Sequence, residues 1–257
     1  TASPTVRLRS GDRPVRLGAA LKHILGDLAE LFGPESARTW FLLAGATVLQ
    51  VAFWYLSTPG PTLLRFAPRD LPSAIEGVGF AVATLFLAPA LLHMLTGGTL
   101  KELGLRVGDA RFGLAALGVC VPVGVLLMVL SSGPAGGLQG SYPWPGTVIG
   151  GNVVVLAAWA VIYACYYLSF EFFYRGFLLK VLAPVTGVHL AVWLQAFAAT
   201  LIHLGKPLPE VIAALPASLL FGVIAVRSKS VVYPALLHLV IGLSLDVAVL
   251  ARTGALF

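Results

Sequence analysis

An acid and a base stand four residues apart inside an apolar stretch of this sequence. Glu171 and Arg175 follow a run from Thr147 to Phe170 that contains no charged residue. Residues four apart share one face of a helix, so these two side chains can pair. A carboxylate at membrane depth is costly unless it is paired or hydrated, and such residues are usually functional. The pair could instead be structural, because many buried ion pairs only hold helices together.

Two histidines and a second acid could complete a site with Glu171. His203 ends a later apolar segment, while His238 and Asp246 lie eight residues apart in the last one, near one helical face. One carboxylate and two imidazoles on three helices could activate a water molecule and stabilise an oxyanion. Each histidine could instead hydrogen-bond to a neighbouring helix. The same groups could ligate a divalent metal, but no HExxH spacing supports one, so we expect no metal and no other cofactor.

The composition is that of a membrane protein. Of the 257 residues, 58% are hydrophobic and 11% are charged, whereas soluble domains carry about 25% charge. Many apolar runs are long enough to span a bilayer as helices, so the expected fold class is an all-α, polytopic membrane bundle. The net charge of +6 suits Lys and Arg next to anionic lipid. Membrane lipids are therefore expected partners, and nucleic acid is not.

The apolar pattern predicts about seven transmembrane helices after an N-terminal segment. Residues 1–38 are expected to form a basic arm and an amphipathic helix in the membrane interface, with apolar residues at helical spacing up to Gly33-Pro34. Residues 39–257 are expected to form the bundle. If the fourth span is helical to Leu179, it is longer than one crossing needs, so we expect a tilt, a kink or an extension. The predicted spans are 39–56, 73–95, 112–130, 147–179, 186–204, 210–226 and 231–250.

The distribution of Lys and Arg among the loops predicts a cytoplasmic N-terminus. This topology places Glu171 and His238 toward the cytoplasmic side and His203 toward the other end of its span. Catalytic partners must lie within hydrogen-bond reach or one water apart. The span that ends at His203 must therefore sit deeper than its apolar limits suggest, and we expect a cavity open to the cytoplasmic leaflet.

Three motifs resemble those of a known family. They are Glu-x-x-x-Arg-Gly-Phe-Leu from Glu171, the histidine that ends an apolar run at His203, and Tyr-Pro-x-x-x-His ending at His238. Together they are similar to the CPBP group of CAAX prenyl endopeptidases and bacteriocin-processing membrane proteins, also called the Abi family, with a family-like core at 147–250. The resemblance implies a metal-independent intramembrane protease. In it, a glutamate and the first histidine activate water, and the second histidine and an asparagine hold the oxyanion.

This chain departs from the family pattern at three positions. Phe170 stands where the first of two adjacent glutamates is usual, and Ala199 stands where an aromatic residue usually precedes the first histidine by four. Gly242 occupies the position of the asparagine. Asp246, one turn farther along, could replace that asparagine. Lys206 and Glu210 form an extra polar group after His203 that could support the site.

The expected function is an intramembrane endopeptidase that cleaves a membrane-associated peptide, in a bacterial inner membrane. Glu171 would be the general base, oriented by Arg175; His203 would share the water, and His238 would stabilise the oxyanion. The three departures also allow a non-catalytic membrane adaptor or chaperone-like subunit with a membrane-protein partner. A transporter with a proton relay is a third reading, although we find no inverted repeat that supports it.

Overall fold

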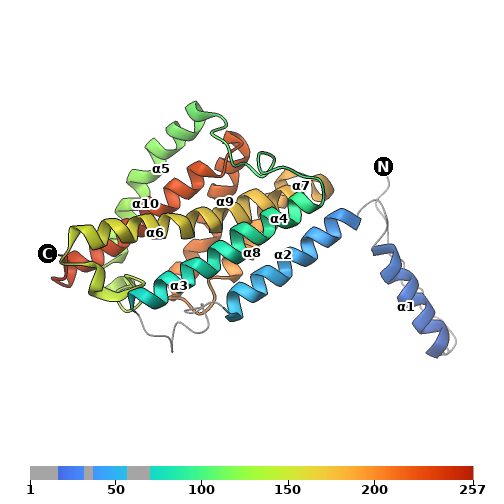
Figure 1. Cartoon of the computed structure of the whole chain (residues 1–257), viewed down its shortest axis with the longest axis horizontal. Coiled ribbons are helices and arrows are strands. Elements are labelled where there is room, and N and C mark those ends of the chain that lie inside the picture. The colour runs from blue at the N-terminus through green and yellow to red at the C-terminus, as the bar shows by residue number, and fades with distance from the viewer. Residues whose placement is uncertain (1–16, 32–36, 57–69, 257) are drawn as a thin grey trace. The chain divides into compact units, whose positions relative to one another are not determined.

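The computed structural model describes residues 17–31, 37–56 and 70–256, and these ranges contain helices and turns but no strand (Figure 1). The predicted all-α class is therefore confirmed. The predicted basic arm at the N-terminus lies outside the described residues. The chain divides into two units, residues 1–41 and 42–257, and each is described by itself.

The first unit contains the predicted amphipathic helix. Helix α1 extends over Leu17–Leu31, and its apolar residues Leu21, Ile24, Leu25 and Leu28 are exposed. A row of exposed apolar side chains is typical of a helix that lies in a membrane interface. The helix is confirmed, and its place at the interface stays a prediction. Helix α2 (Ala37–Leu56) begins in this unit and continues in the second.

Six helical stretches of the described chain are long and apolar enough to cross a membrane, and α8 (Val188–Leu201) is a shorter apolar helix. Their bounds follow the seven predicted spans closely, since each span is one uninterrupted apolar run. Asp109 and Asn152 start two of them by accepting backbone N–H groups that the first turn leaves unpaired. The six stretches are α2; α3 (Leu71–Ala81), η2 (Val82–Leu87) and α4 (Ala88–Leu95); α5 (Ala110–Ser131); α6 (Val153–Glu171), η5 (Phe172–Leu178) and α7 (Leu179–Thr186); α9 (Leu208–Ser228); and α10 (Val232–Arg252).

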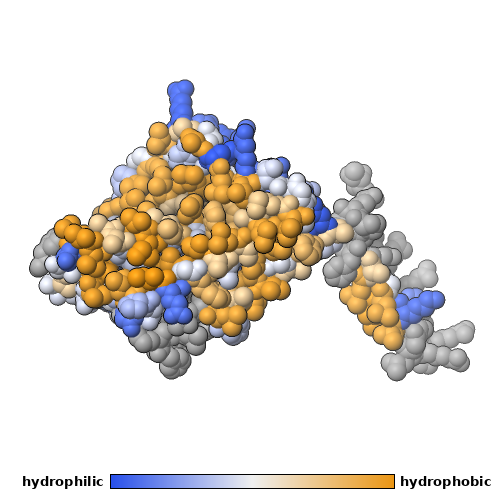
Figure 2. Space-filling view, in the orientation of Figure 1, coloured by the Kyte–Doolittle hydropathy of each residue, from blue (hydrophilic) through white to orange (hydrophobic). Residues whose placement is uncertain are grey.

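The outer surface of the second unit suits lipid. In Figure 2 apolar side chains cover much of the visible face of its bundle, and hydrophilic ones gather toward the edges. Helix α5 is the clearest case, because Val119, Leu126 and Leu130 along it are all exposed. Side chains of this kind are stable against hydrocarbon and unfavourable in water. The chain is therefore an integral membrane protein.

The fourth span is one continuous helix that is longer than a bilayer. Helices α6, η5 and α7 together contain 34 residues, which is about 51 Å at 1.5 Å per residue, against about 30 Å for the hydrocarbon core. The predicted excess length is therefore confirmed. Its middle, η5, is a π-helix, a wider turn that is frequent at functional sites. Glu171 stands at the junction of α6 and η5.

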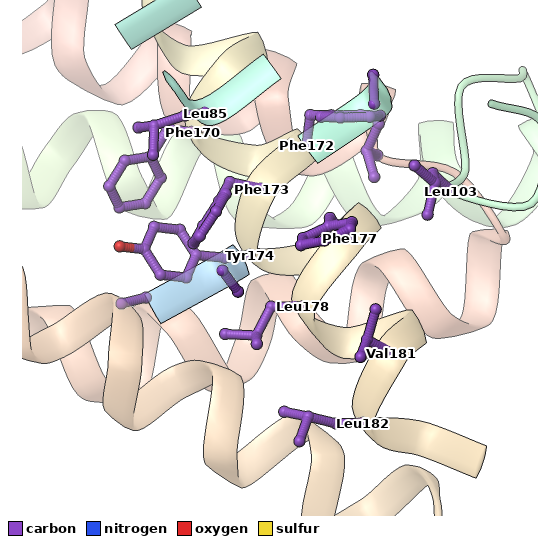
Figure 3. Close-up of a cluster of buried hydrophobic side chains, with 14 of the residues drawn as sticks. Leu85, Leu103, Phe170, Phe172, Phe173, Tyr174, Phe177, Leu178, Val181 and Leu182 are labelled. Atoms are coloured by element: carbon purple, nitrogen blue, oxygen red, sulfur yellow. The ribbon is translucent and has the colours of Figure 1, made fainter. Parts of the chain in front are cut away.

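The side chains of η5 form the centre of the main hydrophobic core. Phe172, Phe173 and Phe177 are fully buried there, and Figure 3 shows them with Leu103, which reaches the same cluster from the loop between α4 and α5. The backbone of that loop also touches η5, because a Cβ atom on Gly176 would lie 2.6 Å from the carbonyl oxygen of Leu103. Only a glycine leaves room for this approach.

The same loop is tied to the turn that precedes α10. The backbone N–H of Val231 donates to the carbonyl of Gly104 over 3.0 Å, and that of Asp109 donates to Ser228 over 2.7 Å. The Arg106 side chain adds a hydrogen bond from its Nε to the carbonyl of Lys229 at 2.9 Å. The loop thus joins η5, which follows Glu171, to the start of α10, which carries His238.

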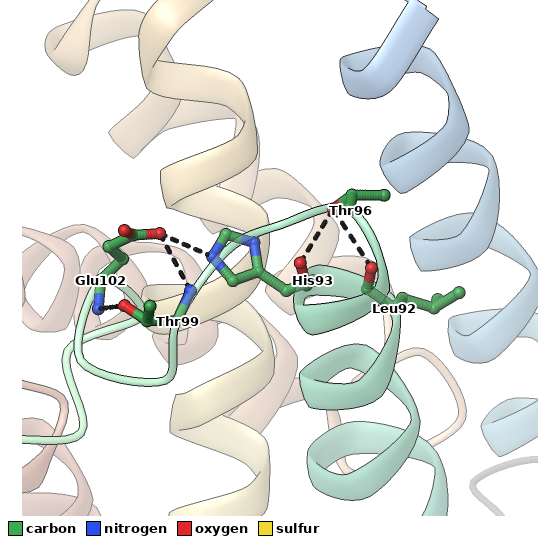
Figure 4. Close-up of polar contacts among 5 residues, drawn as sticks. All are labelled: Leu92, His93, Thr96, Thr99 and Glu102. Atoms are coloured by element: carbon green, nitrogen blue, oxygen red, sulfur yellow. Dashed lines mark hydrogen bonds and ion pairs between the residues drawn. The ribbon is translucent and has the colours of Figure 1, made fainter.

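The other end of this loop is held against α4. Nε2 of the buried His93 lies 3.1 Å from Oε2 of Glu102, which also accepts the backbone N–H of Thr99 at 3.1 Å (Figure 4). The Thr99 N–H and then His93 lower the pKa of Glu102 below its ordinary value. The sequence gives no clear signal for this pair, because Glu102 lies nine residues after His93 in an irregular segment.

Candidate active site

A cavity of about 160 Å³ lies inside the second unit, lined by α6, η5, α9, α10 and the segment after α5. This volume can hold several water molecules. Four of the predicted site residues line it, namely Arg175, His203, Glu210 and His238. The remaining wall is mainly apolar and aromatic, as ligand sites usually are. Charged and imidazole groups from distant parts of the chain therefore meet at one hollow in the bundle.

His203 and His238 line the same cavity, so the two histidines are not separated across the bundle. Glu171 and His203 lie the same number of residues before and after Gly187, where the chain turns from α7 into α8. Two antiparallel segments of similar length that meet at this turn bring both residues to a similar height above it. The expected span limits missed this because α7 continues the fourth span beyond Leu179 and α8 is short.

Glu171 is fully buried and pairs with two groups at once. Its Oε1 lies 2.7 Å from Nδ1 of His238, and its Oε2 lies 3.1 Å from Nε of Arg175. Arg175 is always cationic and cannot accept a proton from Glu171, so we treat Glu171 as a carboxylate, which can only accept hydrogen bonds. The Nδ1–H of His238 therefore donates to the carboxylate, and Nε2 of that ring keeps a lone pair. Glu171 itself does not line the cavity, so it reaches the hollow only through its partners.

Arg175 is buried among aromatic rings. Its Cζ lies 5.4 Å from the ring centre of Phe221 and 5.8 Å from those of Phe170 and Tyr174. Such faces attract a guanidinium. Its NH1 has no hydrogen-bond partner among the described residues, although the side chain is 1% exposed and lines the cavity. A molecule in the cavity could therefore accept a hydrogen bond from Arg175.

His203 is held by the backbone of its own helix. Its Nδ1 lies 2.6 Å from the carbonyl oxygen of Ala199. A carbonyl can only accept, so Nδ1 carries the proton and Nε2 carries a lone pair. Both histidines of the site thus have the same tautomer, each with its Nδ1–H engaged by protein.

Phe170 contacts both histidines. Its ring centre lies 5.8 Å from that of His203 and 5.5 Å from that of His238, and both contacts are edge-on. It is 3% exposed and lines the cavity. At this position the side chain can shape the hollow and exclude water, but it cannot take a proton.

A second polar cluster closes another part of the wall. Oε1 of Glu210 accepts hydrogen bonds from Nζ of Lys206 at 2.7 Å and from the hydroxyl of Tyr142 at 2.8 Å. Burial and then the Glu210 carboxylate raise the pKa of Tyr142 well above its ordinary value, so this hydroxyl stays a neutral donor. Lys206 and Glu210 were expected to support the site, whereas Tyr142 was missed. Its only signal was a tyrosine in a Gly- and Pro-rich loop.

Asp246 lies apart from this hollow. Its Oδ2 accepts a hydrogen bond from Nε1 of Trp159 at 3.1 Å, and it does not line the cavity. Trp159 begins a series of packed rings on α6 that continues through Tyr163 and Tyr167 to His238. Asp246 therefore contacts this series at the end away from His238. Tyr167, which lines the cavity, was also missed by the sequence reasoning.

No group of three or more His, Cys, Asp or Glu side chains that could hold a metal occurs within residues 17–31, 37–56 and 70–256. What the described side chains can do is acid/base chemistry. Two neutral imidazoles with free lone pairs face one cavity, and one of them is backed by a carboxylate, which is the arrangement of a general base and its orienting group. The expected absence of a cofactor stays a prediction.

One comparison with known proteins gives a match. Residues 152–244 match the model of the family described as type II CAAX prenyl endopeptidase Rce1-like. Searches of curated proteins and of solved structures return no match. The matched stretch begins at the Asn152 cap and contains Glu171, Arg175, His203 and His238. Residues 152–244, which carry all three motifs and most of the cavity wall, are thus similar to the Rce1-like CAAX proteases, and this match supports the predicted resemblance to the CPBP family.

Proposed function

We propose that the chain is a membrane endopeptidase in which His238, oriented by Glu171, takes a proton from water. The observation that carries this proposal is the 2.7 Å contact between Glu171 Oε1 and His238 Nδ1. It leaves Nε2 of a cavity-lining imidazole free to act as a base. A buried carboxylate in this position stabilises the imidazolium that forms when the ring is protonated.

The reaction would proceed by two proton transfers. Water gives a proton to Nε2 of His238 while its oxygen attacks the peptide carbonyl carbon. When the tetrahedral intermediate collapses, the C–N bond breaks and His238 returns the proton to the leaving nitrogen. His203, with a lone pair on Nε2, accepts a hydrogen bond from the other O–H of the water and so fixes the position of the water. The products are a carboxylic acid and an amine, and no cofactor is consumed.

The expected roles change in two respects, the first being that His238 takes the proton from water instead of stabilising the oxyanion. Glu171 was expected to act on water directly, but its position behind His238 and outside the cavity lining supports a positioning role. Arg175 holds the other carboxylate oxygen and offers NH1 to the cavity. Lys206 and Glu210 would orient the peptide at the Tyr142 wall. Asp246 would act only through the rings of α6.

The substrate would be a membrane-associated peptide, because the cavity is enclosed within a lipid-embedded bundle and has a mostly apolar lining. We further propose that the protein resides in a bacterial inner membrane with its N-terminus in the cytoplasm, on the basis of its Lys and Arg distribution.

The test is cleavage of a library of lipid-anchored, fluorogenic peptides by the purified protein in liposomes. Replacing His238 by Ala should lower the rate by about 10²–10⁴-fold, the usual contribution of a general base. His189→Ala is the matched control, because His189 is an exposed histidine at the start of α8. Its rate should equal that of the unaltered protein. Equal rates for both variants would remove His238 from the mechanism.

A non-catalytic membrane adaptor is the second candidate, and Phe170 favours it. An apolar ring, rather than an acid, touches both histidines. If this reading is right, the unaltered protein cleaves no peptide in the same library and copurifies with a defined membrane protein. Appearance of cleavage only in a Phe170→Glu variant would support the adaptor over the protease.

A further inference from the structure

We propose that the hydroxyl of Tyr167 donates a hydrogen bond to the oxyanion of the cleaved peptide. This inference rests on the proposed function and adds a catalytic residue to it. Tyr167 belongs to α6, one turn before Glu171, and its side chain lines the cavity. The argument depends on the contact between Tyr167 and Gly242.

The hydroxyl of Tyr167 occupies the space that a side chain on residue 242 would need. A Cβ atom built on Gly242 would collide with Oη of Tyr167, and the ring carbons Cζ and Cε2 would lie only 2.6 and 2.8 Å away. Gly242 is buried within α10. Its backbone is helical, so no unusual dihedral angle requires a glycine there. A glycine inside a helix costs about 0.5–1 kcal/mol relative to alanine, and what it gains here is room for one hydroxyl.

The position of that hydroxyl is set by His238. Gly242 follows His238 by four residues, so both lie on one face of α10, and both line the cavity. The Tyr167 ring itself packs on the His238 ring, with centres 4.2 Å apart at 38°. The phenol therefore reaches along the imidazole to the next turn of the same helix face. We infer that its O–H and the Nε2 lone pair of His238 can both reach a substrate group bound in this part of the cavity.

The ring cannot easily turn away from this position. Tyr167 is 6% exposed, and besides His238 it packs on Tyr163, with ring centres 4.4 Å apart, and on Tyr166 at 5.4 Å. A donor whose orientation is fixed before the reaction needs no reorganisation when negative charge develops. At a mostly apolar cavity wall, such a donor stabilises an oxyanion more than it would in solution.

The two histidines of the cavity do not fill the role of hydrogen-bond donor to the oxyanion. His238 and His203 both present lone pairs, so neither donates to an oxyanion before it takes a proton. Arg175 has an NH1 without a hydrogen-bond partner among the described residues, but a tetrahedral oxyanion has three lone pairs and can accept from more than one donor. Among the side chains of the cavity wall, Tyr167 supplies a neutral O–H directly beside the base.

The test uses Tyr167→Phe, which removes one oxygen and keeps the ring. With a single cleaved peptide, kcat should fall by about 10²–10³-fold, the usual loss for one oxyanion donor, while KM changes by less than about threefold because the ground-state carbonyl binds the site weakly. A peptide phosphonate, which imitates the tetrahedral intermediate, should lose affinity by a similar factor, and the uncleaved peptide should not. The matched control is Tyr166→Phe, which removes a hydroxyl from a ring that packs on Tyr167 but lies outside the cavity lining; its kcat should stay within about threefold of the unaltered protein.

A second variant keeps the inference testable if Phe packs differently. Gly242→Ala leaves Tyr167 intact but displaces its hydroxyl, and should lower kcat in the same direction with a thermal unfolding curve that shows a folded protein. Unchanged kcat in Tyr167→Phe, with His238→Ala inactive, would overturn this inference and leave the protease intact. Absence of cleavage by the unaltered protein under all conditions would overturn both.

Discussion

Arg175 contacts both the buried carboxylate of Glu171 and the aromatic side chains around the cavity. It holds Oε2 of Glu171 at 3.1 Å, lies among three aromatic rings and lines the cavity. Neither charge of the pair has bulk water to replace its partner, because both side chains are buried. Replacing one charge should therefore destabilise the fold more than replacing both. A comparison of single and double variants separates the structural role of the pair from its catalytic role.

Removing only the cation should be more harmful than removing both charges. Arg175→Met leaves Glu171 buried with only His238 as a partner and no permanent cation beside it, and should reduce the free energy of unfolding by about 3–5 kcal/mol. The double variant Glu171→Leu, Arg175→Met should recover most of that loss, since apolar side chains of similar volume can replace a buried pair. Denaturant unfolding in detergent micelles measures both, and peptide cleavage should be lost in both.

A double variant no more stable than the single one would contradict this reading. It would mean that Arg175 stabilises the fold through its contacts with Phe221 and Tyr174 rather than through Glu171.

At the residue scale, the sequence predicted which groups meet but not how they pair. The spacing of Glu171 and Arg175 fixes their contact locally, because four residues make about one turn. The contact of Glu171 with His238 rather than His203 depends on the packing of α10 against α6, which no local spacing encodes. Tyr167 could have been suspected only from Gly242, an internal helix glycine four residues after His238.

The widened helix segment η5 depends on its neighbouring loop. Gly176 stands against the carbonyl of Leu103, and the side chain of Leu103 enters the cluster of η5 phenylalanines. The loop is thus part of the support for Glu171 and Arg175, which lie on the turns before Gly176. A substitution at this contact should therefore loosen the backbone of the loop more than it changes the cavity.

Gly176→Ala should test this support. The added Cβ must displace the Leu103 carbonyl, and such overpacking usually costs about 1–3 kcal/mol. Hydrogen exchange should quicken at the backbone amides of residues 103–109 and at that of Val231, whose partner is Gly104. Gly118→Ala on α5 is the control, because nothing lies within 4 Å of its Cβ. That variant should be neutral or more stable, and equal loosening in both would refute the role of the loop.

At the element scale, the spans could be predicted because each is an apolar run with a marked start or end. The length of α7 could not, since Lys180 and Pro184 look like the end of a helix, yet both lie within it. The π-helical turn at η5 also has no sequence signal that we could read. These two features determine how far Glu171 lies from the ends of its span, and the sequence indicates neither of them.

The whole bundle places the cavity near one of its two ends. Its wall includes Leu138 and Tyr142 from the loop after α5, and Pro209 and Glu210 from the start of α9, but no residue of the loop before α5. These two loops flank α5, so they lie at opposite ends of one spanning helix. If the N-terminus is cytoplasmic, the loop before α5 is cytoplasmic too. The cavity then extends from Arg175 and His238 toward the loop after α5 on the opposite side, and its opening to the cytoplasmic leaflet stays a prediction.

Site-directed labelling decides the orientation. In a protein whose Cys120 and Cys165 are replaced by Ala, single cysteines at Lys101 and at Gly140 mark the two ends of α5. With a cytoplasmic N-terminus, a membrane-impermeant maleimide added to intact cells should label position 140 and not position 101, because the loops rich in Lys and Arg stay in the cytoplasm. The reverse pattern would place the N-terminus outside and the cavity toward the cytoplasm.

The contact between Tyr167 and Gly242 also limits how this site can change during evolution. A single substitution that adds any side chain at position 242 collides with the phenol already present, while a smaller residue at 167 alone leaves a gap in the wall. Passage between this arrangement and one with an amide on the last helix therefore requires both positions to be replaced together. Among relatives, residues 167 and 242 should vary as a pair, with a small residue at one accompanying a large residue at the other.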